Sequence, residues 1–152
     1  LSTCSLRLSN PYGRYQRTDT AQGAVAVFLE RALNEETIEI WGDGGVVRDY
    51  VDVRDAVRAM LLCLEAECAG TEINIGSGVG TSLNQLVRHV EMACGHPVRK
   101  NHQTARPFDV PEIYLDITRA REILGWTPEI DLQEGLAALA SGMKTHEREL
   151  HG

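Results

Sequence analysis

The chain has 152 residues and a formal net charge of −7, with 43% hydrophobic and 24% charged residues. This length and composition fit one globular domain with a sizeable core. The acidic balance argues against a general nucleic-acid binder, and no apolar run approaches the ~20 residues of a membrane helix. We therefore expect no nucleic-acid partner and no membrane span. A small anionic ligand stays open, because one or two arginines suffice to bind it.

The four cysteines and five histidines show no spacing typical of metal ligands. Cys4, Cys63, Cys68 and Cys94 each lie in an apolar run, and none belongs to a C-x-x-C pair. We interpret them as reduced core thiols of a cytoplasmic protein. The sequence therefore predicts no metal site.

The first part of the chain alternates extended and helical segments. Val25, Phe28, Leu29, Ala32 and Leu33 recur at helical spacing. In chain order, we predict a strand over residues 3–8, a polar loop over 10–20, a helix over 22–33, a strand over 38–41, a turn over 42–45 and an extended segment over 46–51.

The rest of the chain continues the alternation, with capping residues at several helix starts. We predict a helix capped by Asp52 and Asp55 and running to Glu65, a strand over 71–75, and a helix with a Ser82–Gln85 capping box ending at Gly95. We then predict an extended segment over 97–102, a short helix capped by Thr118 and ending at Gly125, and a last helix begun by Asp131 and Glu134. Strands alternating with helices predict the α/β class.

The stretch INIGSGVGTS, residues 73–82, has the look of a nucleotide-binding loop. A dinucleotide fingerprint needs G-x-G-x-x-G and an acidic residue about twenty positions later. Gly76 and Gly78 match, but Thr81 stands at the third position and Gly80 comes one residue early. No carboxylate lies in the PVRKNHQ segment that follows at the expected distance. We therefore predict a strand-to-helix turn, with Ser82 capping the helix.

Three stretches, in order and spacing, are more specific. They are R-L-S-N-P-Y-G at 7–13, I-W-G-D-G-x-x-x-R-D-Y-V-D-V-x-D at 40–55, and R-P-F-D-V-P at 106–111 followed by D-x-x-x-A-x-x-x-L-G-W-x-P from 116 to 128. Together they resemble the C-terminal half of the NAD-dependent sugar-nucleotide epimerase/dehydratase family of extended short-chain dehydrogenases, its UDP-glucose 4-epimerases above all. The R-P-F-D stretch departs from the R-P-G-H-D typical of 4,6-dehydratases.

The resemblance implies a role for seven residues. It implies that Leu8 and Ser9 lie near the nicotinamide, that Asn10 binds the nucleotide-sugar, that Trp41 lies beside the base, that Arg48 and Arg106 grip the diphosphate, and that Asp109 accepts from ribose hydroxyls. Arginine suits the diphosphate because it stays charged and presents a planar fork of donors.

A purely structural interpretation is also possible for Asn10, Trp41, Arg48 and Arg106. A turn before proline explains an asparagine, core packing explains a tryptophan, and surface ion pairs explain arginines beside carboxylates. The alternatives are thus a turn at Asn10, a core position for Trp41, and ion pairs of Arg48 with Asp49 and of Arg106 with Asp109. The motif order favours binding for the two arginines and leaves Trp41 open.

Members of the family that the chain resembles carry a Y-x-x-x-K pair and an NAD glycine loop. Neither motif occurs in residues 1–152. Four positions after Tyr12, Tyr15, Tyr50 and Tyr114 stand Gln, Asp, Arg and Thr. We therefore expect residues 1–152 to be the substrate-binding region of a longer enzyme: C-terminal elements of the extended fold with its small α/β domain, without the dinucleotide-binding half. The parent would use NAD for C4 epimerisation through a 4-keto intermediate. The chain alone would be inactive and bind no NAD.

The chain alone would expose apolar faces and self-associate, and the parent is expected to be a homodimer. A stand-alone nucleotide-sugar binding or assembly module, a 4,6-dehydratase fragment and an unrelated α/β domain stay open. Loop 14–22 is expected to help select the sugar, with UDP preferred as the nucleotide.

Overall fold

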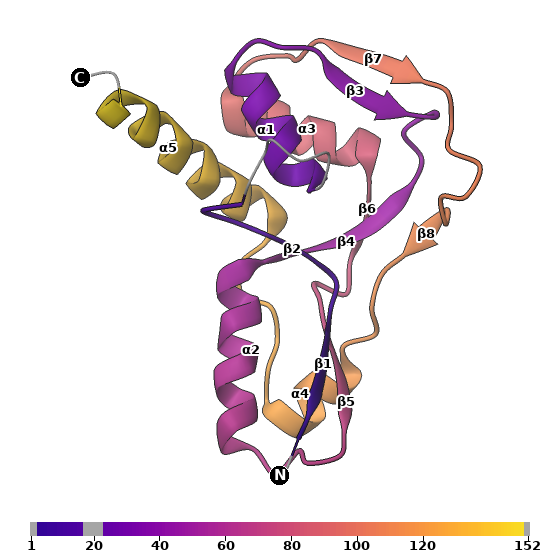
Figure 1. The fold of residues 1–152 in the computed structure, drawn as a ribbon, viewed down its shortest axis with the longest axis vertical. Coiled ribbons are helices and arrows are strands. Elements are labelled where there is room, and N and C mark those ends of the chain that lie inside the picture. Colours follow the sequence, from indigo (N-terminus) through magenta and orange to yellow (C-terminus); the bar gives the residue numbers. More distant parts are fainter. Residues whose placement is uncertain (1–2, 17–22, 151–152) are drawn as a thin grey trace.

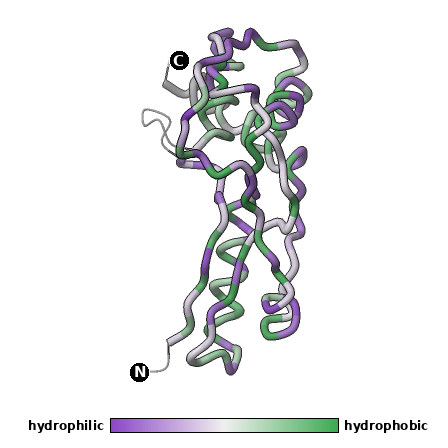
Figure 2. The backbone as a smooth tube through the Cα atoms, turned by 90° about the vertical axis from the view of Figure 1, so that its right-hand side faces the viewer, coloured by the Kyte–Doolittle hydropathy of each residue, from purple (hydrophilic) through white to green (hydrophobic). Residues whose placement is uncertain are grey.

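A computed structural model describes residues 3–16 and 23–150, with side chains through residue 143. The strands are β1 Ser5–Leu8, β2 Asn10–Tyr12, β3 Ile38–Trp41, β4 Val47–Asp52, β5 Glu72–Ile75, β6 Gly80–Ser82, β7 Lys100–Gln103 and β8 Glu112–Ile113. The helices are α1 Ala24–Leu33, α2 Val53–Glu65, α3 Leu83–Cys94, α4 Thr118–Leu124 and α5 Leu132–Leu150. Figures 1 and 2 show an elongated molecule with a lobe at each end.

Strand β4 crosses the middle of the molecule and contributes to both lobes (Figure 1). It pairs in parallel with β2 and β8 and antiparallel with β6. Successive strand residues point to opposite faces. Tyr50 accordingly packs into the core that also holds α1 and α3, whereas Val51 packs into the core that holds β5 and α4. This alternation makes β4 the structural link between the two lobes.

The upper lobe of Figure 1 consists of α1, α3 and α5 beside the parallel pair β3–β7. The apolar stripes of the three helices meet at fully buried positions such as Leu29, Leu86 and Leu136. Helical spacing of apolar residues predicts this burial. The end of β3 and the segment that follows β7, residues 104–111, lie at the edge of this lobe.

The lower lobe consists of the parallel pair β1–β5 with α2 and α4. Ile73 and Ile75 of β5 are fully buried against Trp126, whose indole follows α4. The Trp126 Nε1 donates to the Asp55 carbonyl at 3.0 Å, so the ring is buried with its polar atom satisfied.

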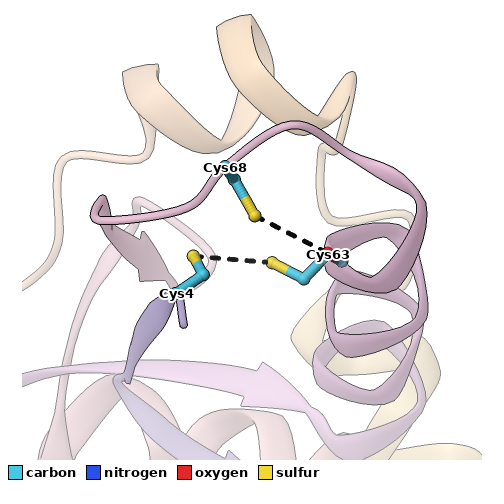
Figure 3. Close-up of side chains that lie close together, drawn as sticks. All are labelled: Cys4, Cys63 and Cys68. Carbon is cyan, nitrogen blue, oxygen red and sulfur yellow. Dashed lines mark hydrogen bonds between the residues drawn. The ribbon is translucent and has the colours of Figure 1, made fainter. Parts of the chain in front are cut away.

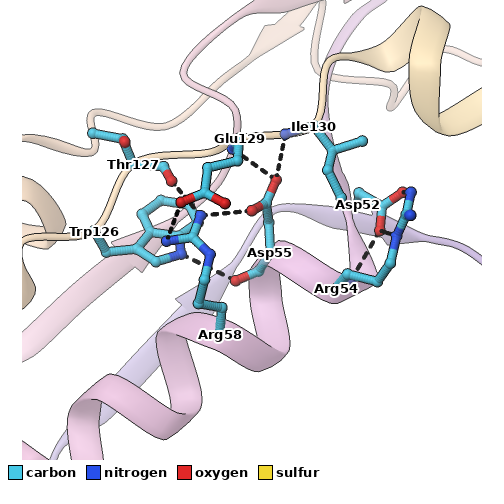
Figure 4. A network of polar contacts seen from close by, with 8 residues as sticks. All are labelled: Asp52, Arg54, Asp55, Arg58, Trp126, Thr127, Glu129 and Ile130. Carbon is cyan, nitrogen blue, oxygen red and sulfur yellow. Dashed lines mark hydrogen bonds and ion pairs between the residues drawn. The ribbon is translucent and has the colours of Figure 1, made fainter.

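A buried carboxylate ties α2 to the segment before α5 (Figure 4). One Asp55 carboxylate oxygen accepts from the amides of Glu129 and Ile130 at 3.0 and 2.9 Å. The other oxygen accepts from Arg58 at 2.6 Å. The prediction that Asp55 helps cap α2 is therefore wrong. Asp52 alone is the N-cap, and its side chain accepts from the Arg54 amide at 2.9 Å.

The predicted ends of the other helices are largely confirmed. Ser82 and Gln85 form the full capping box of α3, and Gly95 and Gly125 end their helices in the left-handed conformation that glycine favours. The N-cap predicted at Thr118 is wrong. Ile117 occupies that position, and Thr118 instead donates from its amide and hydroxyl to one oxygen of Asp116 at 2.9 and 2.6 Å.

Three short strands differ from the prediction, and all pair with β4. Residues 10–12 form β2 where we predicted the start of a loop, residues 80–82 form β6 where we predicted a turn, and residues 112–113 form β8. Pairing with a long neighbour stabilises such short segments, and local sequence carries little trace of it. Helix α1 begins at Ala24, and the predicted start at Gln22 and most of loop 14–22 lie outside the described residues.

One face of α2 exposes a row of apolar side chains at helical spacing. Val57, Met60, Leu61 and Leu64 are all exposed, Leu64 at 83%. Soluble surfaces rarely present such a continuous row without a partner. Across the described chain, none of the helices is long and apolar enough to cross a membrane.

Candidate functional site

The side chains of Trp41 and Arg106 stack on each other at the edge of the upper lobe. Trp41 ends β3 and is 40% exposed, so the core position considered for it is wrong. The Cζ atom of Arg106 lies 4.1 Å from the centroid of the indole. A guanidinium over an indole is a favourable cation–π contact that leaves its edge donors available. One face of the Trp41 ring is therefore covered by a cation.

Arg48 on β4 is tied to the segment that carries the second arginine. Its Nη1 donates to the carbonyls of Val47 and Val110, both at 2.7 Å. The amide of Val47 also donates to the Pro111 carbonyl at 2.8 Å. The described hydrogen bonds of Arg48 use only Nη1, so its Nη2 and Nε remain for an anion. The guanidinium thus has a fixed position and unused donors.

Asp109 lies on the turn that follows Arg106 and is half-buried. Its amide donates to the Arg106 carbonyl at 3.2 Å. Among the described residues, no ion pair joins Arg106 to Asp109 or Arg48 to Asp49. The 106–111 segment is therefore held by its own turn and by Arg48, so the second and third sequence stretches meet at this edge.

Asn10 on β2 contributes the first stretch. Its Nδ2 donates to the Asp49 carbonyl at 2.9 Å, and its backbone pairs with Tyr50 in the parallel register. Asn10 is therefore part of a strand, and the turn considered for it is wrong. Its side chain is exposed, and no described hydrogen bond uses its Oδ1. The amide thus has an acceptor to offer a ligand.

The loop between β5 and β6, residues 76–79, binds the carboxylate of Asp49. Asp49 is fully buried, and its two oxygens accept from the Ser77 amide and hydroxyl at 2.7 and 2.6 Å, from the Gly78 amide at 3.2 Å and from the Leu115 amide at 3.2 Å. A Cβ on Gly76 would come within 2.4 Å of an Asp49 oxygen. The predicted turn is confirmed for residues 76–79 only, since residues 80–82 form β6. Gly76 lets the carboxylate approach, a purpose that sequence reasoning missed.

These contacts limit what the described residues can offer to NAD. The donors of the glycine loop are engaged by Asp49 and do not form a pyrophosphate cradle. The Ser9 hydroxyl is buried without a hydrogen-bond partner and faces Gly76, where a Cβ would lie 3.1 Å from it. Leu8, at the end of β1, is partly exposed. Leu8 and Ser9 thus lie together at the end of β1, where the Ser9 amide donates to the Ile75 carbonyl at 2.9 Å.

The buried tyrosines are poor bases at neutral pH. Burial raises the pKa of Tyr50 to about 12, although the nearby Arg48 opposes the shift. Burial also raises the pKa of Tyr12, and the charge of Asp52 adds to that shift. A catalytic base works best with a pKa near the operating pH. Neither phenol is therefore suited to abstract a proton at neutral pH.

The fold is that of the extended short-chain dehydrogenases. The structure of UDP-glucose 4-epimerase from Thermotoga maritima, solved with UDP-glucose, matches with a TM-score of 0.92 at 39% identity, over 97% of this chain and 47% of that chain. A family model described as the NAD dependent epimerase/dehydratase family matches residues 1–76. The chain belongs to this family, whose cofactor is NAD.

Two further relatives have different activities. The UDP-glucose 4-epimerase of Mycolicibacterium smegmatis is 40% identical over 129 residues, covering 85% of this chain and 41% of that protein. The dTDP-4-dehydro-6-deoxyglucose reductase of Escherichia coli is 36% identical over 140 residues, covering 92% of this chain and 44% of that protein. The chain thus spans about half the length of the curated relatives it matches.

Proposed function

We propose that residues 1–152 form the nucleotide-sugar binding region of an NAD-dependent sugar-nucleotide 4-epimerase that acts on a UDP-hexose. In this proposal Arg48 and Arg106 bind the diphosphate and Trp41 contacts the base. Asn10 and Asp109 bind hydroxyl groups or the base, and Leu8 and Ser9 lie beside the nicotinamide. The reaction would oxidise C4 to a ketone and reduce it from the other face, with the catalytic base supplied by residues beyond these 152.

One observation carries the proposal: Arg48 binds the Val110 carbonyl at 2.7 Å, in the segment that also presents Arg106 over Trp41. Arg48 thereby contacts the segment that carries Arg106, and Arg106 lies against an exposed indole. Paired arginines suit a diphosphate, and an indole suits a flat base. The arrangement supports recognition of both ends of a nucleoside diphosphate.

Calorimetric titration of UDP into the full natural chain that carries these residues tests the proposal. Arg106→Ala and Arg48→Ala should each weaken binding about 10- to 100-fold, since each removes charge-assisted hydrogen bonds. Arg88→Ala, which removes an exposed arginine on α3, is the matched control and should leave binding unchanged. Equal binding by all three variants would reject the assignment of the two arginines.

A 4-keto sugar reductase is the second candidate, favoured by the 36% identity to the Escherichia coli reductase. Both activities need the same diphosphate contacts, so UDP binding does not distinguish them. Product analysis does: an epimerase converts UDP-galactose to UDP-glucose without net consumption of NADH, whereas a reductase consumes NADH with a 4-keto sugar. We favour the epimerase because the Thermotoga epimerase matches 97% of this chain at 39% identity, above the identity to the reductase.

We also propose that the parent enzyme is a cytoplasmic homodimer and that these residues alone neither turn over substrate nor retain NAD. None of the four cysteines, all of which lie in the described residues, forms a disulfide, which fits a reducing compartment. Cell fractionation and the native mass of the parent enzyme would test location and assembly. Equilibrium dialysis of NAD with the 152-residue chain would test retention, with measurable binding contradicting the proposal.

A further inference from the structure

Three cysteines distant in the sequence meet in the lower lobe (Figure 3). Cys4 precedes β1, Cys63 lies on α2, and Cys68 lies in the loop between α2 and β5. Their sulfur atoms all lie within 4.8 Å of one another, and the sulfurs of Cys4 and Cys63 are 3.9 Å apart. The tertiary fold therefore creates a group of three thiols that the sequence spacing does not suggest.

The sulfur separations suit a shared metal ion. Zinc binds thiolate sulfur at about 2.3 Å in a tetrahedron, which puts two ligand sulfurs about 3.8 Å apart. The distance of 3.9 Å between Cys4 and Cys63 matches this value. A disulfide requires sulfurs at about 2.05 Å, roughly half the separation seen here. The separation is thus compatible with a bridging cation and too long for a direct bond between the two sulfurs.

Hydrogen bonds hold the loop that carries Cys68 in place. Its thiol donates to the Cys63 carbonyl at 3.6 Å, and the Thr71 hydroxyl donates to the Cys68 carbonyl at 2.5 Å. The Gly70 amide donates to the Thr3 carbonyl at 2.7 Å, which joins the loop to the start of β1. The same Thr71 oxygen lies 3.5 Å from the Cys4 sulfur. The loop of Cys68 is therefore held beside Cys63 and the start of β1 before any ion binds.

We propose that Cys4, Cys63 and Cys68 bind one zinc ion as three thiolates, with a water or an external ligand in the fourth position. Soft thiolate ligands select zinc over magnesium or calcium. Cys68 is buried, while Cys4 and Cys63 are half-buried and give the ion a path from solvent. The bound ion would join β1, α2 and the loop before β5, and this site is independent of the proposed nucleotide-sugar site.

The test uses the full natural chain, reduced and handled without oxygen. Cobalt titration should produce thiolate charge-transfer bands at one equivalent, and zinc should remove them. Cys4→Ser, Cys63→Ser and Cys68→Ser should each weaken zinc binding by at least about tenfold, since loss of even a supporting group costs this much. Cys94→Ser, which changes the fourth cysteine on α3, is the matched control and should bind as the parent protein does.

Alkylation of the unmodified chain gives a second readout that needs no variant to fold. Zinc should protect three cysteines from iodoacetamide and leave the labelling of Cys94 unchanged, as peptide mass mapping would show. Absence of the cobalt bands, or equal labelling with and without zinc, would overturn the proposal. Formation of a Cys4–Cys63 disulfide in preference to metal binding would overturn it as well, and would assign the cluster to redox chemistry.

Discussion

The guanidinium of Arg106 covers one face of the Trp41 indole, with Cζ 4.1 Å from the ring centroid. The indole comes from the end of β3, and the guanidinium comes from the segment that Arg48 fixes through the Val110 carbonyl. A ligand that bridges the two arginines must therefore change the surroundings of this tryptophan. The stack thus makes the proposed site measurable by spectroscopy.

Tryptophan fluorescence should report ligand binding at Trp41. The only other tryptophan, Trp126, is fully buried in the lower lobe. Acrylamide should quench Trp41 in the free protein, and UDP should reduce this quenching because the ligand covers the exposed ring. Trp41→Leu should abolish the effect of UDP. An unchanged response in that variant would place the ligand elsewhere.

Asp49→Asn should destabilise the protein by about 2–4 kcal/mol. The asparagine amide would face donors that now bind a carboxylate, and buried donors without acceptors are costly. Urea unfolding measures the change. Asp43→Asn is the control, since the Asp43 side chain is exposed and its carboxylate accepts from the Gly45 amide in its turn, at 2.8 Å. Equal stability of the two variants would show that the Asp49 contacts contribute little.

The contribution of Asp52 to stability should depend on pH. Burial alone would raise the pKa of this carboxyl, but its hydrogen bonds with Arg54 outweigh burial and lower the pKa below the ordinary 3.8. A lowered pKa in the folded state stabilises the protein above the unfolded pKa, and this stabilisation is lost as the pH falls through the folded value.

Asp52→Asn keeps a capping oxygen but removes the charge. It should cost about 1 kcal/mol near pH 7, because the Arg54 partner is largely exposed and solvent weakens the pair. The difference from the parent protein should shrink below about pH 4, as Asp52 is protonated in the unfolded state. Chemical unfolding across this range measures it, and a difference independent of pH would contradict the assignment.

Tyr12→Phe should leave stability unchanged or raise it slightly. The Tyr12 hydroxyl is buried without a hydrogen-bond partner, so its removal ends a desolvation cost. Gly135→Ala should be destabilising in contrast, because a Cβ there would lie 2.0 Å from that hydroxyl. In the double variant the phenylalanine should recover part of the loss. Thermal unfolding of the three variants gives the comparison.

The apolar row on α2 should drive self-association of the 152-residue chain. Leu61 and Leu64 are the most exposed members of this row. Leu61→Glu with Leu64→Glu should shift the chain towards the monomer in light scattering. The control is Ile123→Glu, at a less exposed apolar position on α4. This expectation would be contradicted if the unsubstituted 152-residue chain were monomeric.

Local sequence signals predicted the helices well. The capping box of Ser82 and Gln85 and the glycines at 95 and 125 mark helix ends through contacts within a few residues. The α/β class and the family followed from motifs that the fold and comparisons bear out. The assigned roles of Asn10, Arg48, Arg106 and Asp109 stay predictions, although Arg48 contacts the segment that carries Arg106.

Contacts between distant segments could not be predicted. Strands β2, β6 and β8 form only because β4 offers them a partner. Asp55 caps no helix because two amides more than 70 positions away, at Glu129 and Ile130, bind its carboxylate. The meeting of Cys4 with Cys63 crosses 59 positions. Such pairings depend on tertiary packing, and no local pattern encodes them.

The most direct test of the central claim is the conversion of UDP-galactose by the full natural chain with NAD, followed by proton NMR of the sugar anomeric signals. The proposal predicts that UDP-glucose forms and that Arg106→Ala lowers kcat/KM about 10- to 100-fold, while Arg88→Ala leaves it unchanged. Conversion that is equally fast in the Arg106→Ala variant would contradict the account of this site. Absence of conversion by the parent protein would contradict its function as a UDP-hexose 4-epimerase.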